Sequence, residues 1–204
     1  AVAHALTEPR PRHLVVAGGL LAASFTIKET TFLFGLVALV FFLGAGMVAL
    51  VRPRSASRAA VGRLGALGAQ PWIWSFMAFA TVFMVVFTSG FRYAEGLESG
   101  LTDGVRYWWS QQDVGRGGQP WFFYLAVYAA YEWLLLAVAA VGLVVTVRRR
   151  SLVGSWFATM AVGQVLVYAW AGEKFAWLAL HPLIPLTLLA GLGAQAVFER
   201  LRHH

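Results

Sequence analysis

Long apolar segments alternate with short polar ones along the whole chain. A helix crosses a membrane with about 20 mostly apolar residues, at about 1.5 Å per residue. The first apolar stretch, 14–50, is nearly twice that long, and the letters TIKETT interrupt it once, which predicts two helices joined by a tight turn. We therefore predict an all-α polytopic membrane protein, a single membrane domain over 1–204, with about six transmembrane helices at 14–27, 31–51, 72–88, 121–147, 152–170 and 177–198.

One long connection, the loop at 89–120, separates the third and fourth predicted spans. Loops of this length are usually functional or disordered. Within it, apolar residues recur at helical spacing beside polar ones, namely Leu97, Leu101, Val105, Trp108 and Trp109. This pattern predicts an amphipathic helix lying in the membrane interface. The letters GRGGQP follow, with glycines that allow close backbone approach and a proline suited to begin the next helix.

Composition supports the membrane class. The chain is 59% hydrophobic and 12% charged, with a mean hydropathy of +0.68, which is too apolar for an ordinary soluble domain. The net charge of +7 has its usual source in cytoplasmic arginines, so we expect no nucleic-acid partner. Cysteine is absent, which excludes disulfides and thiolate metal sites from this chain. It opens without Met and without a signal-peptide pattern, so we expect a piece of a longer protein.

The distribution of Lys and Arg predicts the orientation of the chain in the membrane, because cytoplasmic loops hold most of these residues. One set of span ends carries eleven: Arg10, Arg12, Arg52, Arg54, Arg58, Arg63, Arg148, Arg149, Arg150, Arg200 and Arg202. The opposite set carries five: Lys28, Arg92, Arg106, Arg116 and Lys174. We predict a multi-pass protein of the cell inner (plasma) membrane with both termini in the cytoplasm. The polar connections around residues 28, 89–120 and 173 then open on the outer face.

Each of these three outer connections holds a cation near an anion: Lys28 beside Glu29, Arg116 near Asp113, and Lys174 beside Glu173. Charges at the membrane edge are costly unless they are paired, hydrated or used. We predict a shared polar site, in which Arg116 clamps a phosphate or carboxylate bidentately. For Lys28 and Glu29, a snorkelling lysine and a helix-capping glutamate are equally consistent, and Arg116 could instead contact lipid headgroups.

Further candidates lie near these connections. Gln119 belongs to the GRGGQP segment, and His181 follows Lys174 by one or two helical turns. A histidine inside a span needs a partner, which makes His181 a site candidate beside Pro182 and Pro185. Glu132 could be a packing group or an acceptor. We expect the aromatic residues Trp108, Trp109, Trp121 and Tyr124 to form an interfacial belt, with stacking on a sugar ring as the alternative.

No His and acidic residues show metal-ligand spacing, and no phosphate-loop, nucleophile-elbow or dinucleotide motif is present. We identify no metal site and no cofactor, and leave a divalent-metal requirement open.

Three segments carry a family resemblance: FTIKETTFL, RYWWSQQDVGRGGQPWFFYLAVYAAYE and AGEKFAWLALHPLIPLTLLAG. In this order they resemble a bacterial and archaeal membrane family described as flippase-activity-associated. That family is related to the dolichyl-phosphate-mannose protein mannosyltransferases of the glycosyltransferase C superfamily. The resemblance covers about residues 25–191.

The resemblance implies a membrane transferase that takes a sugar from a polyprenyl-phosphate donor at the outer face, with an outer carboxylate as base and cations on the departing phosphate. The superfamily's catalytic acid lies in the first outer loop, upstream of Ala1, so the chain is expected to lack a complete active site. The family has a proline two residues after the letters GEK, and this chain has Ala176 at that position. A non-catalytic structural or assembly subunit is the alternative, and transport of a lipid-linked sugar is a weaker one.

Overall fold

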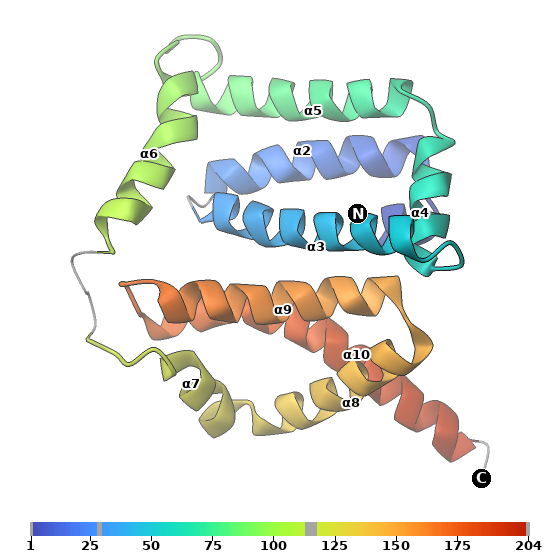
Figure 1. Ribbon diagram of the computed structural model, residues 1–204. Helices are drawn as coiled ribbons and strands as arrows, with labels where there is room; N and C mark the ends of the chain where they lie inside the picture. The colour runs from blue at the N-terminus through green and yellow to red at the C-terminus, as the bar shows by residue number, and fades with distance from the viewer. Residues whose placement is uncertain (1, 28–29, 113–117, 203–204) are drawn as a thin grey trace. The chain divides into compact units, whose positions relative to one another are not determined.

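The computed structural model describes residues 2–27, 30–112 and 118–202, which form helices and connecting loops with no β-strand among them (Figure 1). The residues divide into two compact units. Unit 1 comprises Ala1–Gly35 and Leu43–Ser110, and unit 2 comprises Leu36–Phe42 and Gln111–His204. The helix α3 (Thr31–Val51) therefore contributes to both units.

Unit 1 is built from α1 (Val2–Thr7), α2 (Pro11–Ile27), α4 (Ala56–Gly65), α5 (Gln70–Phe87), α6 (Gly96–Ser110) and the ends of α3. Its main contact joins α2 to α5, which run side by side. A Cβ at Gly18 would overlap the carbonyl of Ser75, so only glycine permits this approach. The Ser75 hydroxyl donates to the carbonyl oxygen of Leu14 at 2.7 Å, which satisfies a polar group inside the contact.

The helix α2 ends at Ile27 and α3 begins at Thr31, on either side of the polar interruption in the first apolar stretch. The Thr31 hydroxyl donates to the carbonyl oxygen of Ser24 at 2.8 Å, which ties the start of α3 to the last turn of α2. A helix end leaves its last carbonyl groups without intrahelical partners, and this bond satisfies one of them.

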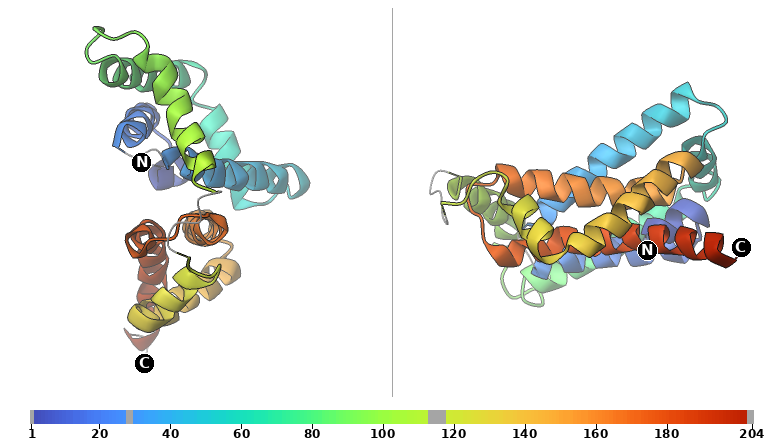
Figure 2. Two further views of the ribbon diagram at one scale, coloured as in Figure 1. Left: turned by 90° about the vertical axis from the view of Figure 1, so that its left-hand side faces the viewer. Right: turned by 90° about the horizontal axis from the view of Figure 1, so that it is seen from below.

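Unit 2 contains α7 (Phe123–Tyr131), α8 (Trp133–Arg149), α9 (Leu152–Trp170), the 3₁₀ turn η1 (Ala176–Ala179), α10 (Leu180–Arg202) and the middle of α3. The helix α10 packs against both α8 and α9 (Figure 2). A Cβ on Gly142 would overlap the carbonyl of Leu189, and one on Gly193 would overlap the carbonyl of Val138. Small residues thus let α8 and α10 pack with their backbones in contact, as is common between helices in membranes.

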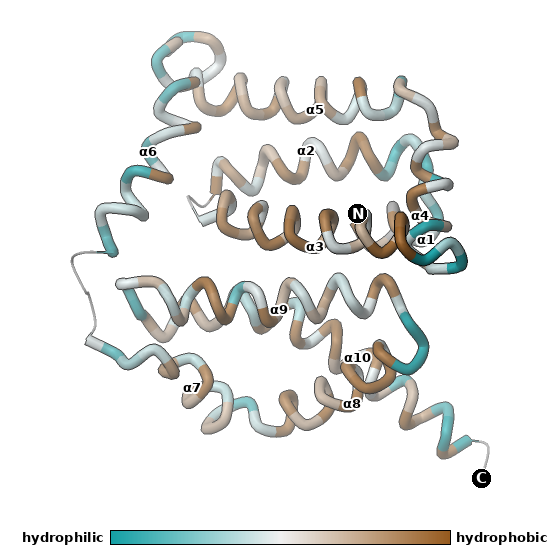
Figure 3. The backbone as a smooth tube through the Cα atoms, in the orientation of Figure 1, coloured by the Kyte–Doolittle hydropathy of each residue, from teal (hydrophilic) through white to brown (hydrophobic). Residues whose placement is uncertain are grey.

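Apolar length confirms the coarse fold class but not the number of spans. Among the described residues, four helices are long and apolar enough to cross a membrane: Thr31–Val51, Gln70–Phe87, Leu152–Trp170 and Ala176–Arg202. The predicted span at 14–27 falls on Pro11–Ile27, an apolar helix below that length. Figure 3 shows apolar residues along α3 and polar residues in the α8–α9 connection. The described helices indicate a membrane protein.

The predicted span at 121–147 is not one straight helix. The helices α7 and α8 meet at Glu132 with a bend of 103°, so the pair is either a broken span or a re-entrant loop. At the break, the Glu132 N–H still donates to the carbonyl oxygen of Tyr128 at 2.8 Å, and the Glu132 carbonyl accepts from the Leu136 N–H at 2.9 Å. Both backbone groups of Glu132 are therefore hydrogen-bonded at the bend, which lowers the cost of placing the break away from water.

The loop between α5 and α7 contains the helix that its apolar spacing predicted. This helix, α6, extends from Gly96 to Ser110. A Cβ on Gly96 would overlap the carbonyl of Phe87, so the start of α6 lies directly against the end of α5. The position of α6 in the membrane interface remains a prediction.

Candidate functional site

Two of the three segments that carry the resemblance meet in unit 2. Gln112 lies just after the end of α6. Its side-chain oxygen Oε1 accepts a hydrogen bond from the N–H of Gly172 at 2.8 Å. A Cβ on Gly172 would lie 2.6 Å from the carbonyl oxygen of Gln112 and 2.9 Å from that of Gln111, so only glycine fits there. The second of the three segments is therefore joined, at Gln112, to the loop that holds Glu173 and Lys174.

Lys174 is held within its own loop. Its ammonium group donates to the carbonyl oxygen of Ala171 at 2.5 Å, and the residue is half-buried. This carbonyl lies just beyond the C-terminal end of α9, where the helix dipole favours a cation. An ammonium group has three N–H donors, and this contact uses one, which leaves the group able to bind an anion. The neighbouring Glu173 is also half-buried.

His181 has the partner that a histidine at this depth requires. It lies in the first turn of α10, and its Nδ1 is 2.6 Å from the hydroxyl of Tyr168 on α9. The two rings stack with centroids 5.7 Å apart. The hydrogen bond and the stacking together fix the orientation of the imidazole and connect α9 to α10.

Two further tyrosines complete a buried polar row that sequence reasoning missed. Tyr124 and Tyr128 lie four residues apart on α7 and so share one face. The Tyr124 hydroxyl donates to the carbonyl oxygen of Phe175 at 3.3 Å, and the Tyr128 hydroxyl donates to that of Ala179 at 2.6 Å. Phe175 directly precedes η1 and Ala179 is its last residue, so both carbonyls lie where regular α-helical bonding is interrupted. The spacing of the two tyrosines was the signal that could have revealed the contact.

The predicted aromatic belt is wrong for two of its four members. Tyr124 is 1% exposed and Trp108 is 9% exposed, so both belong to the protein interior. Trp108 packs edge-on against Phe32, with centroids 6.1 Å apart. Trp109 and Trp121 are 67% and 68% exposed, and remain available to a membrane interface or to a ligand.

Two other polar residues of unit 2, Gln119 and Gln164, make none of these hydrogen bonds. Gln119 is exposed ahead of α7, after Gly118, whose φ of +56° favours glycine. Gln164 is 5% exposed on α9, and its Oε1 has no hydrogen-bond partner. It lies one turn before Tyr168 on the same helix, and no sequence signal singled it out.

Three candidates, Lys28, Glu29 and Arg116, lie outside the described residues, as does Asp113. Their roles stay predictions. Within the described part of the chain, no group of three or more His, Cys, Asp or Glu side chains could hold a metal ion.

The fold and the site define an all-helical protein with several apolar helices that can span a membrane and a loop junction that holds a lysine and a glutamate. Comparison of the chain with protein-family models, with curated proteins and with solved structures found no match.

Proposed function

We propose that this chain is the membrane portion of a glycosyltransferase that uses a polyprenyl-phosphate-linked sugar at the outer face of the plasma membrane. The observation that carries the proposal is the hydrogen bond between Gln112 and Gly172, 2.8 Å long. It joins the second and third of the segments that carry the resemblance, and with them the loop of Lys174. Both termini lie in the cytoplasm in this proposal, and the donor lipid is the partner.

In the proposed reaction, the bond between the sugar's anomeric carbon and a phosphate oxygen breaks, while the acceptor hydroxyl forms a new bond to that carbon. The hydroxyl proton passes to a carboxylate, and the phosphate leaves with additional negative charge. Lys174 has free N–H donors for that charge, and Arg116 provides a second cation whose guanidinium suits phosphate. Gln119, Glu173 and His181 would bind or position the sugar phosphate, and Lys28 with Glu29 would add the third outer connection.

The test is sugar transfer by the full-length protein in proteoliposomes, from a panel of radiolabelled polyprenyl-phosphate hexoses. We expect Arg116→Ala to reduce transfer by about 100-fold or more, the scale of losing one preorganised charge partner of a transition state. The control is Arg106→Ala, which removes an arginine that is 72% exposed on α6 and should change transfer by less than about threefold. Equal transfer by wild type and Arg116→Ala would remove Arg116 from the mechanism.

A non-catalytic structural or assembly subunit is the second candidate. It is favoured by the use of buried polar side chains in helix contacts, since Tyr124, Tyr128 and Tyr168 each bond another part of unit 2. Wild-type protein that folds and binds membrane partners but transfers no sugar from any donor would support this candidate over the transferase.

A further inference from the structure

Unit 1 contains a cavity of about 310 Å³ between the ends of α2, α3 and α5 and one face of α6. Small-molecule sites commonly have volumes of about 300–1,000 Å³, so the cavity is large enough for a small ligand or part of a lipid. Much of its lining is apolar: Phe25, Ile27, Phe32, Phe87, Leu101 and Val105.

The elements around the cavity are held by packing on both sides. The ring of Phe25 contacts that of Phe83 edge-on at 6.4 Å, which joins α2 to α5. Gly100 allows the backbone of α6 to approach the ring of Phe87, where a Cβ would overlap it. At the other end of α6, Trp108 packs against Phe32 of α3. The cavity is therefore bounded by elements that pack against one another.

The polar part of the lining comes mainly from α6. Ser99 and Asp103 are four residues apart and share a face of that helix, and Thr26 adds a hydroxyl from α2. Among the described lining residues, Asp103 is the only one with an ionisable side chain. The cavity thus combines an apolar wall with hydroxyl groups and one carboxylate.

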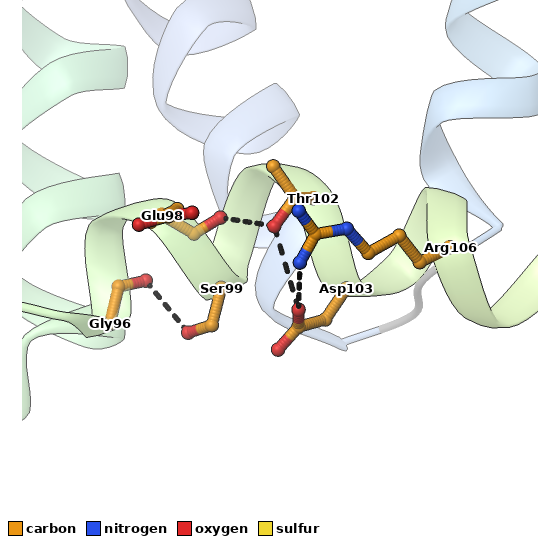
Figure 4. Close-up of polar contacts among 6 residues, drawn as sticks. All are labelled: Gly96, Glu98, Ser99, Thr102, Asp103 and Arg106. Carbon is orange, nitrogen blue, oxygen red and sulfur yellow. Dashed lines mark hydrogen bonds and ion pairs between the residues drawn. The ribbon is translucent and has the colours of Figure 1, made fainter.

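Figure 4 shows two contacts of the Asp103 carboxylate, an ion pair with Arg106 and a hydrogen bond that it accepts from the Thr102 hydroxyl at 3.5 Å. In the ion pair, Nη1 of Arg106 lies 4.0 Å from Oδ1 of Asp103, and the side chains of Asp103 and Arg106 are 64% and 72% exposed. Exposed pairs at such distances contribute little. A carboxylate has two oxygens and about four acceptor positions, so Asp103 can accept hydrogen bonds from a ligand's hydroxyl groups.

We propose that this cavity binds a neutral amphiphile that carries several hydroxyl groups, such as a glycosylated lipid, with its alkyl chain against the apolar wall and its hydroxyls on Asp103 and Ser99. A carboxylate repels a phosphate but accepts from hydroxyls, which favours a sugar headgroup over an anionic one. The apolar wall favours a chain-bearing ligand over a free sugar. This site goes beyond the proposed transfer reaction and does not require it.

The test uses the full-length protein in phosphatidylcholine nanodiscs, photolabelled with octyl β-glucoside that carries a diazirine in its chain. We expect saturable labelling of peptides from α6 and from the ends of α2 or α5. Unlabelled octyl glucoside should compete, and octyl phosphate should not. Labelling that does not saturate, or that octyl phosphate competes better than octyl glucoside, would overturn the proposal.

Two variants locate the site. Asp103→Asn keeps the shape of the side chain and should weaken competition by octyl glucoside about tenfold, because hydrogen bonds to a charged acceptor are lost. The matched control is Glu98→Gln on the same helix, an exposed carboxylate outside the lining, which should leave competition unchanged.

Gly104→Leu places a side chain in the cavity and should abolish saturable labelling. If this variant does not fold, the comparison of Asp103→Asn with Glu98→Gln decides, and equal affinities would overturn the proposal.

Discussion

At the scale of single residues, the interior of unit 2 depends on side-chain donors that reach main-chain carbonyls. Tyr128 is 3% exposed and donates to Ala179 at 2.6 Å, where η1 gives way to α10. A buried carbonyl without a donor costs about 1–3 kcal/mol. The tyrosine hydroxyls therefore matter to stability even if no substrate contacts them.

Tyr128→Phe should lower the stability of the protein by about 1–3 kcal/mol, since it removes the donor and retains the ring. The measurement is thermal unfolding in detergent, followed by circular dichroism. Tyr131→Phe is the matched control, because Tyr131 is on the same helix and is 80% exposed. Identical melting temperatures for the two variants would contradict a structural role for the Tyr128 hydroxyl.

The sequence predicted which side chains need a partner better than it predicted where each side chain lies. His181 required a partner, and the structure provides Tyr168 at 2.6 Å. Which residue would serve was not predictable, because the two come from different helices whose contact depends on tertiary packing. Tyr124 was misplaced in an interfacial belt because aromatic residues near span ends are common both at interfaces and in interiors.

At the scale of elements, helix contacts in both units rely on glycines placed where backbones meet. Gly18 lies against Ser75 in unit 1, and Gly142 and Gly193 lie at the contact of α8 with α10 in unit 2. Apolar side chains gain little by leaving lipid, so close van der Waals packing becomes the main source of helix association in a membrane.

Gly193→Ala should disrupt the contact between α8 and α10, since its methyl group would overlap the backbone carbonyl of Val138. We expect a lower melting temperature and aggregation during size-exclusion chromatography. Gly191→Ala is the matched control, because a Cβ at Gly191 of the same helix meets nothing within 4 Å. If both variants elute and melt like wild type, the close packing of α8 on α10 is contradicted.

The apolar pattern predicted where helices lie but could not show where they bend. Segment 121–147 is apolar enough for one span, yet it breaks at Glu132 by 103°. Hydropathy reports composition averaged over a window and carries no information on direction. A single glutamate inside an apolar stretch was the signal at this position, and it is also consistent with an unbroken helix.

At the scale of the whole molecule, sugar transfer at the outer face depends on which side of the membrane each loop occupies. The proposed transferase requires that the Gln112–Gly172 junction lies on the outer face and that the arginine-rich turns lie in the cytoplasm. The sequence predicts the side of the membrane for each loop only from the distribution of Lys and Arg. The bent pair α7–α8 bears on the same question, because a re-entrant loop would place its two ends on one side.

Single-cysteine labelling in intact cells tests this most directly, since the chain has no cysteine of its own. The variants are Gln119→Cys and Ala176→Cys near the junction, and Arg54→Cys and Arg148→Cys in the arginine-rich turns, all at exposed positions. We predict that a membrane-impermeant maleimide labels the first two in intact cells and the last two only after permeabilisation. Labelling of Gln119→Cys and Arg148→Cys from the same side would make α7–α8 re-entrant, and a junction labelled only after permeabilisation would contradict sugar transfer at the outer face.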